Sequence, residues 1–307
     1  MSAATGLAPL AVRPVAPPAP APPLSPRRAA FLAADVARLT TLARAAPEHP
    51  TRIVTAADTF VVAGGDPGAP VDAVVSLTER LVNALYTQGF RHRADEAALL
   101  MVYSSAAPFQ RALLSLPRAD DEAPLDLNSF GMYDERRHLI LVRTDTAGIY
   151  SGTHEVVHHL MGDGDFPKAP EWISEGIPSL FEAWDQSPTG QLRFKAHFRL
   201  QTLRDLLAST NYDLSSEVTL EAAFSWLDER FEEGPRAYLR LAVAREALRF
   251  MAQRGVLWSF YGECRDDILA HYDCEPAFVH AFGREPRAVT AEWREWINSR
   301  EAEGTGP

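Results

Sequence analysis

The chain has 307 residues, a net charge of -11, and an ordinary balance of apolar (46%) and charged (23%) residues. This composition is typical of a globular protein, and no apolar run approaches the roughly 18 residues that a membrane span requires. The acidic charge disfavours nucleic acid and membranes as partners, because nucleic acid and anionic membrane surfaces would repel it.

The chain begins with a stretch rich in proline and alanine, residues 1–26. Proline has no backbone N–H to donate and the stretch has no apolar face to bury, so we expect a disordered tail. It also lacks the basic start and the uninterrupted apolar segment of a signal peptide, which favours a cytoplasmic location.

Residues 27–161 alternate between helical and strand patterns and predict the N-terminal lobe of one domain, built on a sheet. Apolar residues spaced three to four apart predict helices, and short apolar runs predict strands. The expected helices are residues 29–46, 71–90 and 108–116, and the expected strands lie in residues 51–65, 98–105 and 130–144. We expect residues 138–144 to form an edge strand along which an extended peptide pairs through its backbone.

Residues 162–303 show few strand signals and predict a mainly helical C-terminal lobe, with clear helical spacing over 193–209, 238–255 and 288–300. Cys264 and Cys274 fall in a stretch that has the pattern of one helix, where they would stand about 15 Å apart. A disulfide tolerates about 7 Å between Cα atoms, so we expect two reduced thiols.

The motif HEVVH, residues 154–158, places two histidines one helical turn apart. At about 100° per residue, His154 and His158 share one face of a helix, and the two valines lie on the other. Imidazoles at this spacing can reach one zinc ion, while Glu155 flanks the metal without binding it. The motif therefore predicts a metal-binding helix with an apolar face toward the core.

A third ligand is expected from a second segment, EWISEGIPSLFE at residues 171–182. Glu175 follows His158 by seventeen residues and completes the two-histidine, one-glutamate set of a catalytic zinc site, which leaves one position open for water. We therefore predict one Zn2+ ion held by His154, His158 and Glu175.

Other residues near the motif receive weaker assignments. Ser151 is the expected N-cap of the metal helix, and Gly162 is its expected end. His159 points about 100° away from the ligand pair, so we expect a surface group or a partner of a ligand. Glu182 either orients a ligand histidine or is a solvated carboxylate.

HEVVH together with WISEGIPSLFE resembles the gluzincin metallopeptidases, especially the aminopeptidase N-like catalytic domain and small bacterial proteins with a peptidase MA-like domain. The likeness runs from about residue 50 to residue 300. It implies a zincin-like α+β fold, a peptide or protein substrate, and Glu155 as the general base that deprotonates water. It also implies a tyrosine that stabilises the oxyanion, for which Tyr238 is the candidate and Tyr212 and Tyr261 are competitors.

Two features depart from that family. Pro178 stands where the family usually has alanine, and inside a helix it would bend the segment. The Gly-Ala-Met-Glu-Asn segment that recognises a free peptide amine is absent, and FGMYDE occupies its place. Asp134 or Glu135 would have to substitute for it, so the resemblance does not extend to aminopeptidase activity.

Two alternatives remain open at the level of sequence. One is a peptidase fold that has lost catalysis and serves as a binding module, although an intact Glu155 argues against it. The other is a zinc hydrolase of a non-peptide substrate, because a metal-activated water attacks many acceptors. No feature of the sequence predicts an oligomeric state.

Overall fold

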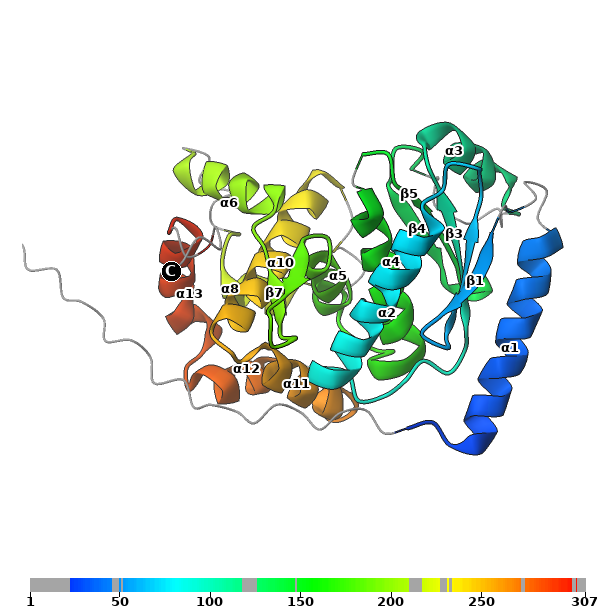
Figure 1. The fold of residues 1–307 in the computed structure, drawn as a ribbon. Coiled ribbons are helices and arrows are strands. Elements are labelled where there is room, and N and C mark those ends of the chain that lie inside the picture. The colour runs from blue at the N-terminus through cyan, green and yellow to red at the C-terminus, as the bar shows by residue number, and fades with distance from the viewer. Residues whose placement is uncertain are drawn as a thin grey trace, which may run out of the picture.

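The computed structural model describes residues 23–45, 50, 52–117, 126–146, 148–209, 217–226, 231, 234–271, 274–299 and 302. Most of the predicted N-terminal tail therefore lies outside the described residues. The described chain is α+β, with a mixed sheet in its N-terminal half and mainly helices in its C-terminal half (Figure 1).

A five-stranded mixed sheet forms the centre of the N-terminal half, in the order β1-β2-β3-β5-β4. The three inner strands run parallel, and the two outer strands are antiparallel to their neighbours. The register places Val62 beside Leu100, and Leu100 beside Ile140. The strands are β1 (Ile53–Ala56), β2 (Phe60–Gly64), β3 (Ala98–Tyr103), β4 (Gly131–Asp134) and β5 (Leu139–Arg143).

The sheet is covered on both faces, which explains why its inner strands are apolar throughout. Val61, Leu99 and Leu141 belong to an apolar cluster with α1 (Pro26–Ala45) and α3 (Ala106–Ser115). Their neighbours in each strand point the other way and join the main core with α2 (Val71–Gln88) and α4 (Ser151–Leu160) (Figure 1). The predicted metal-binding helix, α4, is thus fixed on one face of the sheet.

The prediction that residues 138–144 form an edge strand is wrong. β5, predicted as the edge, lies inside the sheet between β3 and β4, whereas β4 is the edge strand. The short turn Glu135–Arg137 folds β4 back onto the side of β5 that β3 leaves free. On this side of the sheet, the open backbone edge therefore belongs to residues 131–134, and β1 forms the other edge.

The C-terminal half is mainly helical, as predicted. Its main core is continuous with the face of the sheet that carries α4. The predicted helix over 193–209 starts later than expected, because residues 192–194 form a strand of a small hairpin. The elements are α5 (Glu171–Leu180), β6 (Trp184–Gln186), β7 (Leu192–Phe194), α6 (Phe198–Ala208), α8 (Leu220–Ser225), α10 (Ala237–Gln253), α11 (Leu257–His271), α12 (Glu275–Phe282) and α13 (Pro286–Ile297).

The prediction of two reduced thiols is wrong. Cys264 lies in α11 and Cys274 directly precedes α12, and the two are joined by a disulfide with Cα atoms 4.8 Å apart. The helix that would have separated them ends at His271, and a new helix, α12, begins at Glu275. Among the described helices, none has both the length and the apolar content needed to cross a membrane.

Candidate metal centre

The helix α4 presents the two histidines of HEVVH because its other face is anchored in the core. Val156, Val157 and Leu160 are fully or almost fully buried, as the predicted wheel requires. His154 and His158 are only partly buried and point away from the sheet, toward α5. The helix begins at Ser151 with Tyr150, not Ser151, at the N-cap position.

Gly162 was expected to end the helix, but it lies within a helical turn that continues to Asp165. The α-helix stops at Leu160 and continues as a π-helical turn, Met161–Asp165, which we call the π-turn. Such turns change the direction of a helix without a full break. The widened turn brings Asp163 under the end of α4, beside the imidazole of His159.

The third predicted ligand is brought to the same place by α5. Pro178 lies within the last turn of this helix, so the bend expected from it does not move Glu175 away. The position of α5 is fixed by close packing at Gly176, where an added Cβ would stand 2.5 Å from Leu248 Cδ1 of α10. The Thr153 hydroxyl of α4 also donates to the carbonyl of Phe181.

The three predicted ligands converge. His154 Nε2 and His158 Nε2 are 2.8 Å apart, and the Glu175 oxygens lie 3.5 Å from the first and 3.3 Å from the second. A tetrahedral zinc with bonds of about 2.0 to 2.1 Å separates its ligand atoms by about 3.3 Å. Two of the three distances match this value, and the third requires the imidazoles to part by about 0.5 Å. The donor set therefore fits a zinc ion.

Glu182 contacts His154 at Nδ1, the ring nitrogen that does not face the other predicted ligands. Orienting a ligand histidine is one of the two roles that the sequence left open. His154 Nδ1 lies 3.1 Å from Glu182 Oε1, an ion-pair contact without the alignment of a linear hydrogen bond. Burial alone would raise the pKa of Glu182, but His154 and then Arg199 outweigh it and lower the pKa to about 2. A carboxylate at Nδ1 leaves Nε2 free to bind a metal, the arrangement found around many ligand histidines.

Glu182 is itself held by two groups that the sequence did not single out. Arg199 forms an ion pair with it, and His197 Nε2 lies 3.4 Å from the same carboxylate. Burial, followed by the charge of Arg245, lowers the pKa of His197 to about 4, so its ring is neutral at pH 7. A histidine and an arginine two residues apart gave no signal at metal-binding spacing, and only the fold brings them to Glu182.

Glu155 takes no part in the set of three ligands and lies beside it, as predicted. Its side chain lies against Gly131 of β4, where an added Cβ would stand 2.8 Å from both Cγ and Oε1 of Glu155. Burial raises the pKa of Glu155 more than the neighbouring histidines lower it. A carboxyl group with a raised pKa is better able to accept and return a proton near neutral pH.

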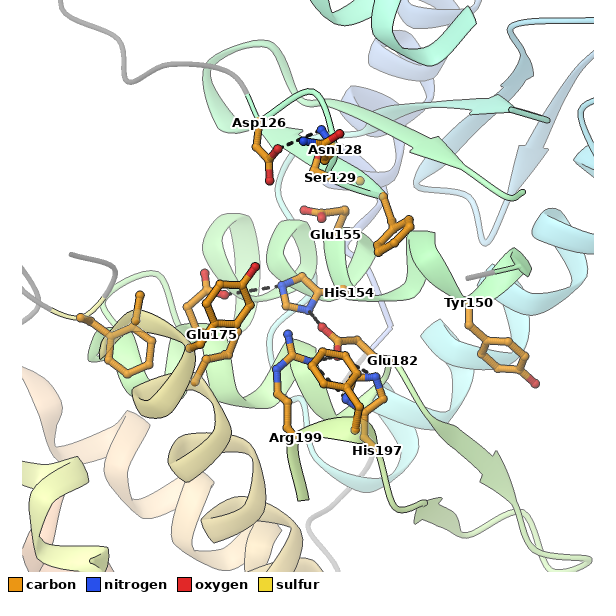
Figure 2. Close-up of a pocket in the computed structure, with 17 residues that line it drawn as sticks. Asp126, Asn128, Ser129, Tyr150, His154, Glu155, Glu175, Glu182, His197 and Arg199 are labelled. Carbon is orange, nitrogen blue, oxygen red and sulfur yellow. Dashed lines mark hydrogen bonds and ion pairs between the residues drawn. The ribbon is translucent and has the colours of Figure 1, made fainter. Parts of the chain in front are cut away.

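These side chains open into a cleft of about 1070 Å3 between the two halves of the domain. Figure 2 shows Glu155 on the side of His154 that faces Ser129, with Glu182, His197 and Arg199 on the opposite side. The lining comes from the loop and edge strand 126–131, α4, α5, the start of α6 and the start of α10.

Access to the cleft distinguishes the candidate tyrosines. Tyr238 is largely exposed and lines it, as the oxyanion role requires. Tyr261 is fully buried and stacks on Phe90 in the core, so it is no longer a competitor. Tyr212 lies outside the described residues. Tyr150 also lines the cleft, but its hydroxyl points away from His154 (Figure 2).

The remaining sequence assignments have mixed outcomes. Asp134 caps the turn after β4 and pairs with Arg137, so it is occupied in the hairpin. His159, expected at the surface or beside a ligand, is fully buried and contacts Asp163.

The chain was also compared with known proteins. No family model matches it, and no curated protein matches it.

Proposed function

We propose that this protein is a zinc-dependent metallopeptidase of the gluzincin type, with a zincin-like fold. One observation carries the proposal: donor atoms of His154, His158 and Glu175 meet 2.8 to 3.5 Å apart, close to the spacing of zinc ligands, beside a cleft that His154 and Glu175 line. Glu155 lies next to them but outside the ligand set. A structural zinc site needs neither an adjacent base nor a cleft.

Each residue has a distinct role in this proposal. When bound, zinc supplies Lewis-acid chemistry, lowering the pKa of water and polarising a carbonyl group. Glu155 takes the proton from the attacking water and returns it to the leaving amine. Glu182 holds the ring of His154, and Tyr238 donates a hydrogen bond to the developing oxyanion.

The shape of the cleft supports a peptide as the substrate. Its volume exceeds that of most small-molecule pockets, and its wall includes the edge strand β4. An extended peptide can add to an open strand through backbone hydrogen bonds that do not depend on its sequence. These contacts would place one peptide bond over the metal centre and leave side-chain preference to the rest of the cleft.

The proposal is tested by zinc analysis together with cleavage of a broad peptide library. We expect the wild type to bind zinc at His154 and His158 and to cleave peptides. Glu155→Gln should keep the zinc and lose nearly all turnover, because an amide cannot accept the proton. Tyr238→Phe should keep the zinc and lose about 10²- to 10³-fold in turnover, the usual cost of one oxyanion donor.

The outcomes separate this function from its alternatives. Zinc at the site without cleavage of any peptide would indicate a binding module or a hydrolase of another substrate. Cleavage that persists in Glu155→Gln would contradict the proposed mechanism. Zinc content that stays the same after both histidines are replaced by alanine would contradict the metal centre itself.

A further inference from the structure

A second group of potential metal ligands lies behind the metal helix, away from the cleft. It contains His138 in the turn directly before β5, His159 near the end of α4, and Asp163 in the π-turn. One nitrogen or oxygen of each side chain lies within 4.8 Å of the others. His159 is fully buried, and the other two are mostly buried.

The outer nitrogen of each ring faces an oxygen acceptor. His138 Nε2 lies 2.8 Å from the Glu96 carboxylate, and His159 Nε2 lies 3.2 Å from the Glu96 backbone carbonyl. Acceptors at both positions place a proton on each Nε2. In the neutral imidazole the lone pair is then on Nδ1, the ligand state in which an outer oxygen fixes the tautomer of a metal-binding histidine.

Both Nδ1 atoms point at one oxygen. Asp163 Oδ2 lies 2.8 Å from His138 Nδ1, 2.7 Å from His159 Nδ1 and 3.0 Å from the Tyr133 hydroxyl. The Tyr133 hydroxyl also lies 3.1 Å from His159 Nδ1. Two ring nitrogens, one carboxylate oxygen and one hydroxyl are therefore gathered within a few ångströms, all of them groups that can bind a metal ion.

The cluster is compact and shielded from solvent. The ring centroids of His138 and His159 are 6.0 Å apart, and His159 is fully buried. A divalent cation between the three inner atoms would take two ring nitrogens and one carboxylate oxygen as ligands.

We propose that His138, His159 and Asp163 form a second zinc site, with the Tyr133 hydroxyl next to the fourth position. Two imidazole nitrogens and a carboxylate oxygen are a ligand set that suits zinc. None of these residues lines the cleft, so the site is structural. It ties the β4–β5 hairpin and the π-turn to the end of α4, one residue from the catalytic ligand His158.

The test is the zinc content of the purified full chain after saturation with zinc and dialysis against zinc-free buffer. We expect two zinc ions in the wild type and one in His154→Ala/His158→Ala. We also expect one zinc ion in His138→Gln/Asp163→Asn. A control pair on the surface, His280→Gln/Glu263→Gln, removes a comparable contact and should keep two.

One zinc ion in the wild type and none in His154→Ala/His158→Ala would overturn the proposal. The cluster of His138, His159 and Asp163 would then be held by hydrogen bonds alone. This double variant also decides the question if His138→Gln/Asp163→Asn fails to fold by circular dichroism. The second site then predicts that His154→Ala/His158→Ala takes up cobalt(II) with visible absorption of a nitrogen-ligated ion, and absence of that absorption would contradict it. The proposed catalytic centre is judged separately, by the zinc that His154→Ala/His158→Ala loses.

Discussion

At the scale of single residues, the position of Glu155 depends on a neighbour without a side chain. Gly131 of β4 lies against Glu155, and a methyl group there would stand 2.8 Å from the carboxyl oxygen. The glutamate would have to move. Since a displacement of about 1 Å in a catalytic group can cost about 10²-fold in rate, we expect a side chain at position 131 to impair the proposed catalysis without changing the proposed metal ligands.

We therefore predict that Gly131→Ala lowers kcat by about 10²-fold while zinc content stays the same. Steady-state kinetics and metal analysis measure the two effects. Gly162→Ala serves as the control, because an added Cβ there meets open space, and it should keep full activity. Equal kcat for Gly131→Ala and the wild type would show that Glu155 has room to adapt or is not the base.

His197 gives the protein a dependence on acid pH. Its pKa falls from 6.5 to about 4 on folding, because burial and then the charge of Arg245 disfavour the protonated ring. The unfolded chain therefore binds a proton as pH drops below 6.5, and the folded chain does not until about pH 4. Stability that is present above pH 6.5 is lost across this interval.

The loss attributable to His197 between pH 7 and pH 5 is about 2 kcal/mol, given 1.36 kcal/mol per pKa unit. We predict that His197→Gln loses less stability than the wild type over this range, by about that amount. Urea unfolding at both pH values measures the difference. Equal losses in the two proteins would show that His197 titrates normally in the folded state.

At the scale of elements, the packing of α5 on α10 sets the position of Glu175. Gly176 follows the ligand directly, and an added Cβ would stand 2.5 Å from Leu248 Cδ1 and 3.3 Å from Ala244 Cβ. Both atoms belong to α10, so the two helices approach closely at this point. A larger residue would separate the helices and tilt the third ligand.

Gly176→Ala should therefore lower the free energy of unfolding by about 1 to 3 kcal/mol, the usual cost of overpacking a core. Gly262→Ala is the matched control in another helix, since its added Cβ meets no atom closer than 3.8 Å. That control should be stabilised by up to about 1 kcal/mol, the gain in helix propensity. Urea denaturation compares the two. A neutral Gly176→Ala would mean that α5 and α10 can shift apart without cost.

Local patterns predicted the elements better than their arrangement. The helix α2 and the strands β1, β2 and β3 follow from apolar periodicity, because burial of one face or of a whole strand fixes which residues are apolar. The hairpin of β4 and β5 was also found, but not which strand forms the edge. Pairing of distant strands, such as β3 with β5, is decided by the whole sheet and leaves no local pattern.

The two candidate metal sites also differ in how far the sequence predicts them. His154 and His158 could be predicted because one helical turn puts both on one face, and a known pattern supplied Glu175. His138, His159 and Asp163 lie on a turn, a helix and a π-turn, and their spacing in the sequence matches no metal-binding motif. The disulfide was missed for a related reason, since the end of α11 at His271 is invisible in its helical pattern.

At the scale of the whole molecule, one apolar core joins the sheet half to the helical half. Buried residues of β2, β3, β5, α2 and α4 form a single cluster with those of α5, α10, α11 and α13. The predicted division at residue 161 is thus a division into lobes around one core. We expect the two lobes to unfold together, because neither can keep its share of this core covered alone.

The proposed metal centre joins the same two lobes, since α4 packs on the sheet and α5 packs on α10. Zinc that binds only the folded chain adds about 4 kcal/mol of stability at a free concentration 1,000 times its dissociation constant. We predict that a chelator lowers the midpoint of thermal unfolding and that far- and near-ultraviolet circular dichroism still report one coincident transition. In His154→Ala/His158→Ala the chelator effect should shrink to the part that the second site contributes. Separate transitions for secondary and tertiary structure, or a midpoint that the chelator leaves unchanged, would contradict a metal that holds one cooperative core together.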